Sequence, residues 1–171
     1  MKFLDNHHIV NGWTVIDING GAKASDVVSL KNWGHVAIVL DFGACTAGPD
    51  VDITVYASDD VAKTHTVALD DYTFRKSPGT TSSDTFAAEV EITDAKLDYV
   101  AGGDIEPDTD DDSIVVIELD AAQVKAAGTD YNYDCVYVSF ANPGQVTLCG
   151  CKFILSEPRY AAATMPSAIV D

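Results

Sequence analysis

The chain of 171 residues carries 10 basic and 27 acidic residues, which gives a formal net charge of −17. Binding to nucleic acid or to an anionic membrane needs clustered Lys and Arg, so this composition argues against direct contact with either. No apolar run approaches the roughly 18 to 20 residues of a membrane span, and polar residues interrupt the N-terminal "MKFLDNHHIVNGW", unlike a signal peptide. We expect one soluble domain that is not exported by a classical route.

Short β-rich runs bounded by Gly, Asp, Asn and Pro dominate the chain. In chain order, strands are predicted over 13–18, 35–42, 51–58, 71–76, 85–92, 113–119, 135–140 and 145–155. The run "HVAIVLDF" is nearly all apolar, which is typical of a strand covered on both faces, whereas "VDITVYAS" alternates like a strand with one buried face. One short helix is predicted, with Asp120 as its N-cap and Gly128 as its stop.

These elements predict an all-β fold, a single-domain antiparallel β-sandwich or jelly-roll with one short helix and extended terminal arms. We expect an N-terminal arm over 1–12, the sandwich over 13–155 and an extended C-terminal arm over 156–171. The last arm, "SEPRYAAATMPSAIVD", has two prolines and no helical period, yet it ends on apolar residues. A terminus without a role is usually polar, so this arm is expected to make contacts.

The four cysteines are too few for a disulfide framework in a chain of this length. Cys149 and Cys151 are two residues apart, so on a strand they point to the same face. A thiolate metal site needs a second such pair, which is missing. We interpret the cysteines as buried thiols of a reducing compartment, in preference to a metal site.

The densest charged segment is "DIEPDTDDD" at 104–112, with six acids in nine residues. It invites comparison with a calcium loop, because hard cations take several oxygen ligands. The first three EF-hand ligand positions match, but serine replaces the required glycine, leucine stands at the twelfth position, and strands are predicted to flank the loop. An exposed acidic loop is therefore favoured, no cofactor is expected, and the weak metal-ligand candidates are Asp108, Asp110 and Asp112.

The sequence contains no recognisable catalytic motif. None of the four histidines lies in a nucleophile motif, and the glycine pairs match neither GxGxxG nor the Walker pattern. Paired carboxylates are uninformative, because 27 acids always allow some pair at a suitable distance. We therefore expect a protein that is not an enzyme. Aromatic residues such as Trp13 and Trp33 are better explained by packing than by a sugar-binding platform.

Four segments, taken in order, resemble a group of tailed-bacteriophage virion structural proteins. They are "NWGHVAIVLDFGA", "DVDITVYASDDVA", "IVVIELDAAQVKAAGTDYNYDCVYVSFANPG" and "FILSEPRYAAATMPSAIVD". The resemblance covers most of 32–171 and is specific in its order, above all in "ELDAAQV" before "YDCVYV" and in the "PRYA" and "PSAIVD" end. None of these segments is a catalytic motif.

The resemblance implies a virion component with a β-sandwich or jelly-roll fold, most like a head decoration (cement) protein. Such a protein is made in the host cytoplasm and binds the major capsid protein on the outer surface of the capsid, often as a homotrimer. A tail, connector or baseplate subunit is an alternative, as is a carbohydrate-binding (receptor-binding) module.

The arms are the predicted contact segments, because an extended segment can add a strand to a neighbouring sheet edge. Arg and Tyr are favoured at binding hot spots, and proline limits the entropy lost on docking. The interface candidates are Phe3, Leu4, Arg159, Tyr160, Pro166, Ile169 and Val170. The alternative is that Tyr160, Ile169 and Val170 fold back onto their own domain.

Overall fold

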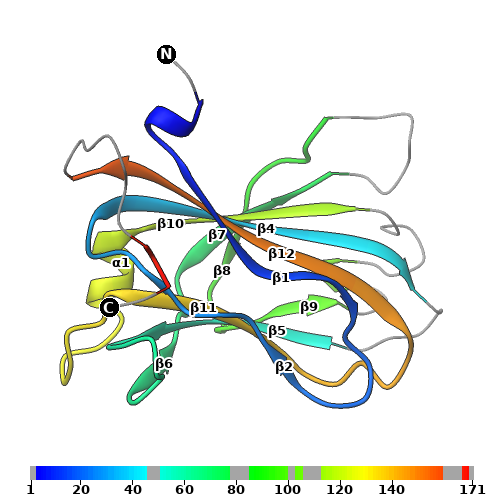
Figure 1. Cartoon of the computed structure of the whole chain (residues 1–171). Helices are drawn as coiled ribbons and strands as arrows, with labels where there is room; N and C mark the ends of the chain where they lie inside the picture. Colours follow the sequence, from blue (N-terminus) through cyan, green and yellow to red (C-terminus); the bar gives the residue numbers. More distant parts are fainter. Residues whose placement is uncertain are drawn as a thin grey trace.

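The computed structural model describes residues 3–45, 51–77, 85–99, 103–105, 113–159 and 167–169. Two antiparallel sheets stack face to face as a β-sandwich, which confirms the predicted all-β class (Figure 1). One six-stranded sheet has the order β1-β12-β4-β10-β7-β8. The other has the order β2-β11-β5-β6, with β3 added on β11 and β9 on β5.

The elements have the following bounds. They are the 3₁₀ turn η1 (Phe3–Asp5), β1 (His8–Asp17), β2 (Lys23–Ala24), β3 (Val28–Ser29), β4 (Trp33–Cys45), β5 (Val51–Ser58), β6 (Thr66–Ala68), β7 (Tyr72–Lys76), β8 (Val90–Ile92), β9 (Leu97–Tyr99), β10 (Ile114–Asp120), α1 (Ala121–Ala126), β11 (Cys135–Phe140) and β12 (Thr147–Pro158). In the part of the chain that the structure describes, no helix is long and apolar enough to cross a membrane.

The strands pair in a nested order. The first strand pairs with the last, β2 and β3 pair with β11, β4 pairs with β10, and β5 pairs with β9. This is the order of a long two-stranded ribbon folded over into two sheets, which is the jelly-roll arrangement. Strands β6, β7 and β8 lie between β5 and β9 in the sequence and extend the sheets beyond that ribbon.

The core fills the space between the two sheets. Ile38 and Leu40 of β4 are fully buried, and they lie opposite Phe153 and Cys151 of β12. Phe140 enters the same cluster from the second sheet. Each such side chain contributes about 1.5–3 kcal/mol by leaving water, so this cluster is the main source of stability.

Most of the predicted elements are confirmed. Strands β5 and β11 match the predicted ranges 51–58 and 135–140, and the backbone N–H of Asp120 donates to Gln123 Oε1 at 2.8 Å at the start of α1. Strand β1 begins at His8, so the last part of the predicted N-terminal arm pairs with β12. Of the predicted strand 85–92, only Val90–Ile92 is a strand.

One expectation about β4 is wrong. Its inward side chains are buried, but Ala37 and Val39 on the opposite face are only half-buried. The apolar run predicts that both faces of β4 are covered, but the described part of the chain covers only its inner face. The prediction that Cys149 and Cys151 point to the same face is confirmed, since both lie on the buried face of β12, whereas Cys45 is only half-buried.

Candidate interaction surface

The outer face of the six-stranded sheet, turned away from the core, carries a band of aliphatic side chains. The register places Ile9 of β1 beside Ile154 of β12, and Ile154 beside Ala37 of β4. Two residues after Ala37 on β4, Val39 lies beside Val116 of β10. We call this set the apolar band; its members are Ile9, Ala37, Val39, Ile114, Val116 and Ile154, all of them half-buried or exposed.

The apolar band follows from residue parity along each strand. On β12, Cys151, Phe153 and Leu155 point into the core, so Ile154 between them points outward. The side chain of Ile9 is 46% exposed. Polar side chains such as Lys152 and Asp41 interrupt the band. An aliphatic core with polar neighbours is the composition of a protein–protein contact surface.

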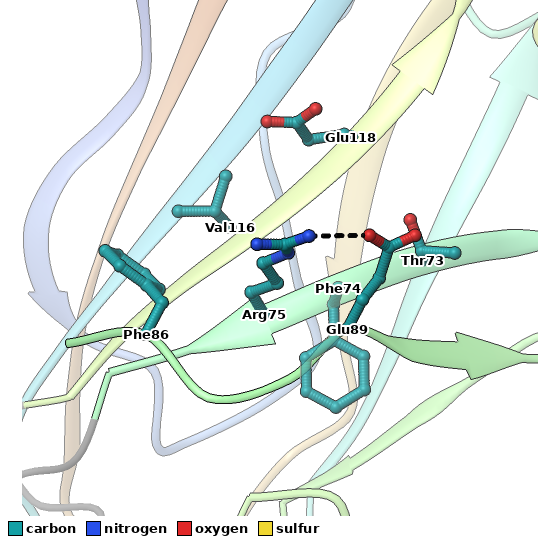
Figure 2. A pocket seen from close by; sticks show the side chains of 7 residues that line it. All are labelled: Thr73, Phe74, Arg75, Phe86, Glu89, Val116 and Glu118. Atoms are coloured by element: carbon teal, nitrogen blue, oxygen red, sulfur yellow. Dashed lines mark hydrogen bonds and ion pairs between the residues drawn. The ribbon is translucent and has the colours of Figure 1, made fainter.

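A groove of about 450 Å³ adjoins the band over β7 and β10 (Figure 2). Val116 and Phe86 form its apolar wall, and Arg75 Nη2 donates to Glu89 Oε2 at 2.9 Å across it. The hydrogen bonds from Arg75 and Thr73 hold the pKa of the Glu89 carboxyl below its ordinary value. The guanidinium is thus already engaged, and the groove offers a mixed surface for binding.

His35 lies beside the groove and is held in place by its neighbours. Its Nδ1 is 3.0 Å from Ser156 Oγ, and its Nε2 is 3.5 Å from a carboxylate oxygen of Glu118, which also lines the groove. Both ring nitrogens of His35 therefore lie near polar side chains, and its strand β4 is central in the sheet.

The N-terminal interface candidates lie on the surface. Phe3 and Leu4, in η1, are 52% and 68% exposed. The Phe3 ring stacks on the His7 ring with 4.2 Å between centroids, and His7 Nδ1 lies 2.9 Å from the Phe3 carbonyl oxygen. Both side chains are therefore open to a partner.

The C-terminal candidates divide into two groups. Arg159 is exposed and its backbone N–H donates to the Asn32 carbonyl at 2.9 Å, while Ile169 is 46% exposed. Tyr160, Pro166 and Val170 lie outside the described residues.

Between those positions, one residue of the arm packs onto its own domain. The side chain of Ala168 is buried in the main core cluster, and its carbonyl accepts a hydrogen bond of 2.7 Å from the backbone N–H of Ser29 in β3. Sequence reasoning singled out Ile169 and Val170 of this apolar end but gave Ala168 no role. A small apolar residue in a run of apolar residues carries no signal that separates it from its neighbours.

The metal-ligand candidates Asp108, Asp110 and Asp112 also lie outside the described residues. Within the described ranges, no group of three or more His, Cys, Asp or Glu side chains is arranged to hold a metal ion. At the start of the acidic segment, Asp104 accepts a hydrogen bond of 3.0 Å from the backbone N–H of Asp98. This carboxylate therefore ties the start of the acidic segment to β9.

The aromatic residues are used mainly in packing. Trp33 is buried in the core, and Trp13 packs on Phe140 with 5.1 Å between ring centroids. The exposed ring of Tyr131 stacks on His65 at 3.6 Å. The hydrogen bond from His65 to Asp59, 2.7 Å long, lowers the pKa of the Asp59 carboxyl.

No protein-family model and no curated protein matches the chain. Among solved structures, it is similar to the SPBc2 prophage-derived protein YomS, with 8% identity, a TM-score of 0.45, and 89% of this chain and 94% of that chain covered. A tobacco necrosis virus structure shows 12% identity and a TM-score of 0.24, with 90% of this chain and 97% of that chain covered. With TM-scores this low, these similarities establish neither a shared fold nor a shared function.

Proposed function

We propose that this chain is a structural protein of a tailed-bacteriophage virion that decorates and stabilises the outer surface of the capsid. It works by protein–protein contact, without catalysis, and its partner is the major capsid protein. The ordered set of sequence segments that resembles virion structural proteins supports this class of protein. The single structural observation that carries the proposal is the apolar band on the outer sheet face.

Strand β4 carries two members of the apolar band, Ala37 and Val39. Between His35 and Asp41, its sequence is apolar on both faces, as in strands that are covered on both sides. The described part of the chain covers only the inner face, and Ala37 and Val39 remain accessible on the outer one. Exposed apolar side chains that gather on one face mark interaction sites on soluble proteins, and here polar side chains such as Lys152 and Asp41 lie among them. A partner surface that packs on this sheet would complete the cover.

The test is binding of the purified protein to emptied, expanded capsids that lack it, measured by co-sedimentation. We expect saturable binding by the wild-type protein. Ile9→Lys places a charge in the apolar band and is expected to weaken binding about tenfold, which corresponds to about 1.4 kcal/mol. The matched control is Val146→Lys, because Val146 is 47% exposed and lies in the loop before β12.

The control variant is expected to bind like the wild type and to melt at the same temperature as Ile9→Lys. Absence of saturable wild-type binding would overturn the proposal. Equal losses for Ile9→Lys and Val146→Lys would remove the apolar band from it, because a general effect of added charge would then explain both.

A further inference from the structure

A small notch beside α1 gathers three of the ten basic residues of this acidic chain. Lys31, Lys125 and Arg159 line it together with one carboxylate, Asp134. Three cations and one carboxylate give the lining a net charge of +2, against −17 for the chain. We call this feature the basic notch; its charge favours an anionic occupant.

The fold builds the basic notch from separate segments. Lys125 is in the last turn of α1, and Arg159 follows β12. The backbone N–H of Arg159 donates to the Asn32 carbonyl at 2.9 Å, and that of Leu30 donates to the Asp134 carbonyl at 2.7 Å. These bonds join the end of β12, the segment before β4 and the segment before β11, so the backbone around the notch is fixed.

The carboxylate in the lining is engaged within its own loop. Asn132 Nδ2 donates to Asp134 Oδ2 at 3.3 Å, and the Cys135 thiol donates to Oδ1 at 3.3 Å. Guanidinium and ammonium groups form their strongest hydrogen bonds with carboxylates and phosphates. The long side chains of Lys125 and Arg159, both exposed, can turn toward such a group on a partner.

The size of the notch limits what enters it. Its volume is about 120 Å³, and a water molecule occupies about 30 Å³ in the liquid. There is room for a side-chain carboxylate with little accompanying water. The basic notch is therefore suited to single acidic side chains.

The chain itself carries a complementary surface. A second pocket, of about 480 Å³, is lined by Glu91, Asp94, Asp98 and Asp104 and by no basic residue. Lys96 Nζ lies 3.2 Å from Asp98 Oδ1 and offsets one of the four charges. We call this the acidic pocket; it shares no lining residue with the basic notch, and the strands that flank it lie away from α1 (Figure 1).

We propose that the basic notch binds a second copy of this chain, with Lys125 and Arg159 of one copy contacting the acidic pocket of the next. Such a contact joins two different surfaces, so it repeats from copy to copy and forms either a closed ring or an open chain. Capsid decoration does not require this contact. It adds a mode of self-association that uses none of the residues of the apolar band.

Local attraction can exceed the repulsion between two acidic chains. At physiological ionic strength the screening length is about 8 Å, so charges outside the contact interact weakly across it. The paired groups lie well inside that distance when the surfaces meet. Exposed ion pairs are individually weak, so the contact is expected to be dynamic in solution and sensitive to single charge reversals.

A charge-swap experiment tests the proposal by sedimentation velocity at protein concentrations up to about 1 mM, the range of weak association. One variant carries Lys125→Glu and Arg159→Glu, and the other carries Glu91→Lys and Asp94→Lys. All four side chains are exposed, so folding is expected to be preserved. Each variant alone is expected to self-associate at least tenfold more weakly than the wild type, and an equimolar mixture of the two is expected to associate again.

The matched control for net charge is Lys23→Glu with Lys152→Glu, since neither residue lines the basic notch or the acidic pocket. It is expected to keep wild-type self-association. A wild-type protein that stays monomeric throughout the concentration range would overturn the proposal, as would a mixture of variants that fails to associate. No capsid is present, so this result is independent of the binding test above.

Discussion

At the scale of single residues, Tyr72 places a polar hydroxyl group in the core, which the sequence pattern of its strand does not reveal. Tyr72 is fully buried in β7, and within the described residues its hydroxyl has no hydrogen-bond partner. Burial is the main cause of the raised pKa of this phenol, and the carboxylates of Asp104 and Asp94 add to it. A buried polar group without a partner costs about 1–3 kcal/mol in desolvation, so the ring stabilises the core while its hydroxyl does not.

Tyr72→Phe is therefore expected to leave the free energy of unfolding unchanged or to raise it by about 1 kcal/mol, because the ring stays and the unpaired group leaves. Urea denaturation measures the change. Tyr137→Phe is the comparison, since the Tyr137 hydroxyl bonds to Thr66, and it is expected to lower stability by about 1 kcal/mol. A loss of 1 kcal/mol or more in Tyr72→Phe would show that the hydroxyl has a partner.

At the scale of an element, β1 reaches its partner strand only because one position lacks a side chain. A Cβ at Gly12 would lie 2.8 Å from both Cys151 Sγ and a ring carbon of Phe153. The register between β1 and β12 shifts at this glycine, between Asn11 and Trp13. Glycine thus allows close packing of the edge strand on the buried side chains of Cys151 and Phe153 in β12.

Gly12→Ala is expected to lower the free energy of unfolding by about 1–3 kcal/mol, the usual cost of overpacking a core. The control is Gly43→Ala in β4, where the nearest atom to a Cβ, on Leu148, is 3.5 Å away in ordinary contact. That variant is expected to be near neutral. Equal stability of the two variants in a thermal melt would contradict the packing argument for β1.

The C-terminal arm is the second element with a testable role. Removal of residues 160–171 takes away the buried Ala168 and leaves the Ser29 N–H without its acceptor. At about 1 kcal/mol for a hydrogen bond, the melting temperature is expected to fall by about 2–4 °C. Ile169→Ser changes only an exposed side chain and is expected to leave it unchanged. An unchanged melting temperature after truncation would mean that the arm contributes nothing to its own domain.

Much of the element scale is predictable from sequence. The strands over 51–58 and 135–140 alternate cleanly between two turn signals, so their ends are defined locally. The short strands β2, β3, β6 and β9 were missed, because two or three residues hold no measurable period. They exist because a longer neighbour offers them hydrogen bonds, and that depends on tertiary pairing.

The candidate surface was less accessible to prediction. The apolar excess of 35–42 was visible in the sequence, but the cover on its second face cannot be judged before the sheet order is known. The nested pairing of β1 with β12 and of β4 with β10 brings Ile9, Val39 and Val116 onto one face from distant parts of the chain. Residues that far apart share no local pattern.

At the scale of the whole molecule, three surfaces have proposed partners. The apolar band is assigned to the capsid, and the basic notch and the acidic pocket to neighbouring copies. Net charge then has a general role, because a formal charge of −17 disfavours association everywhere except where local chemistry offsets it. Contacts made by such a protein are expected to be confined to those surfaces.

The most direct test of the central claim is a cryo-electron microscopy reconstruction of emptied, expanded capsids incubated with the purified protein. We predict ordered density for many copies on the outer shell, with the sheet that contains β4, β10 and β12 facing the capsid protein. A bare shell, or density only at the tail or portal, would contradict capsid decoration.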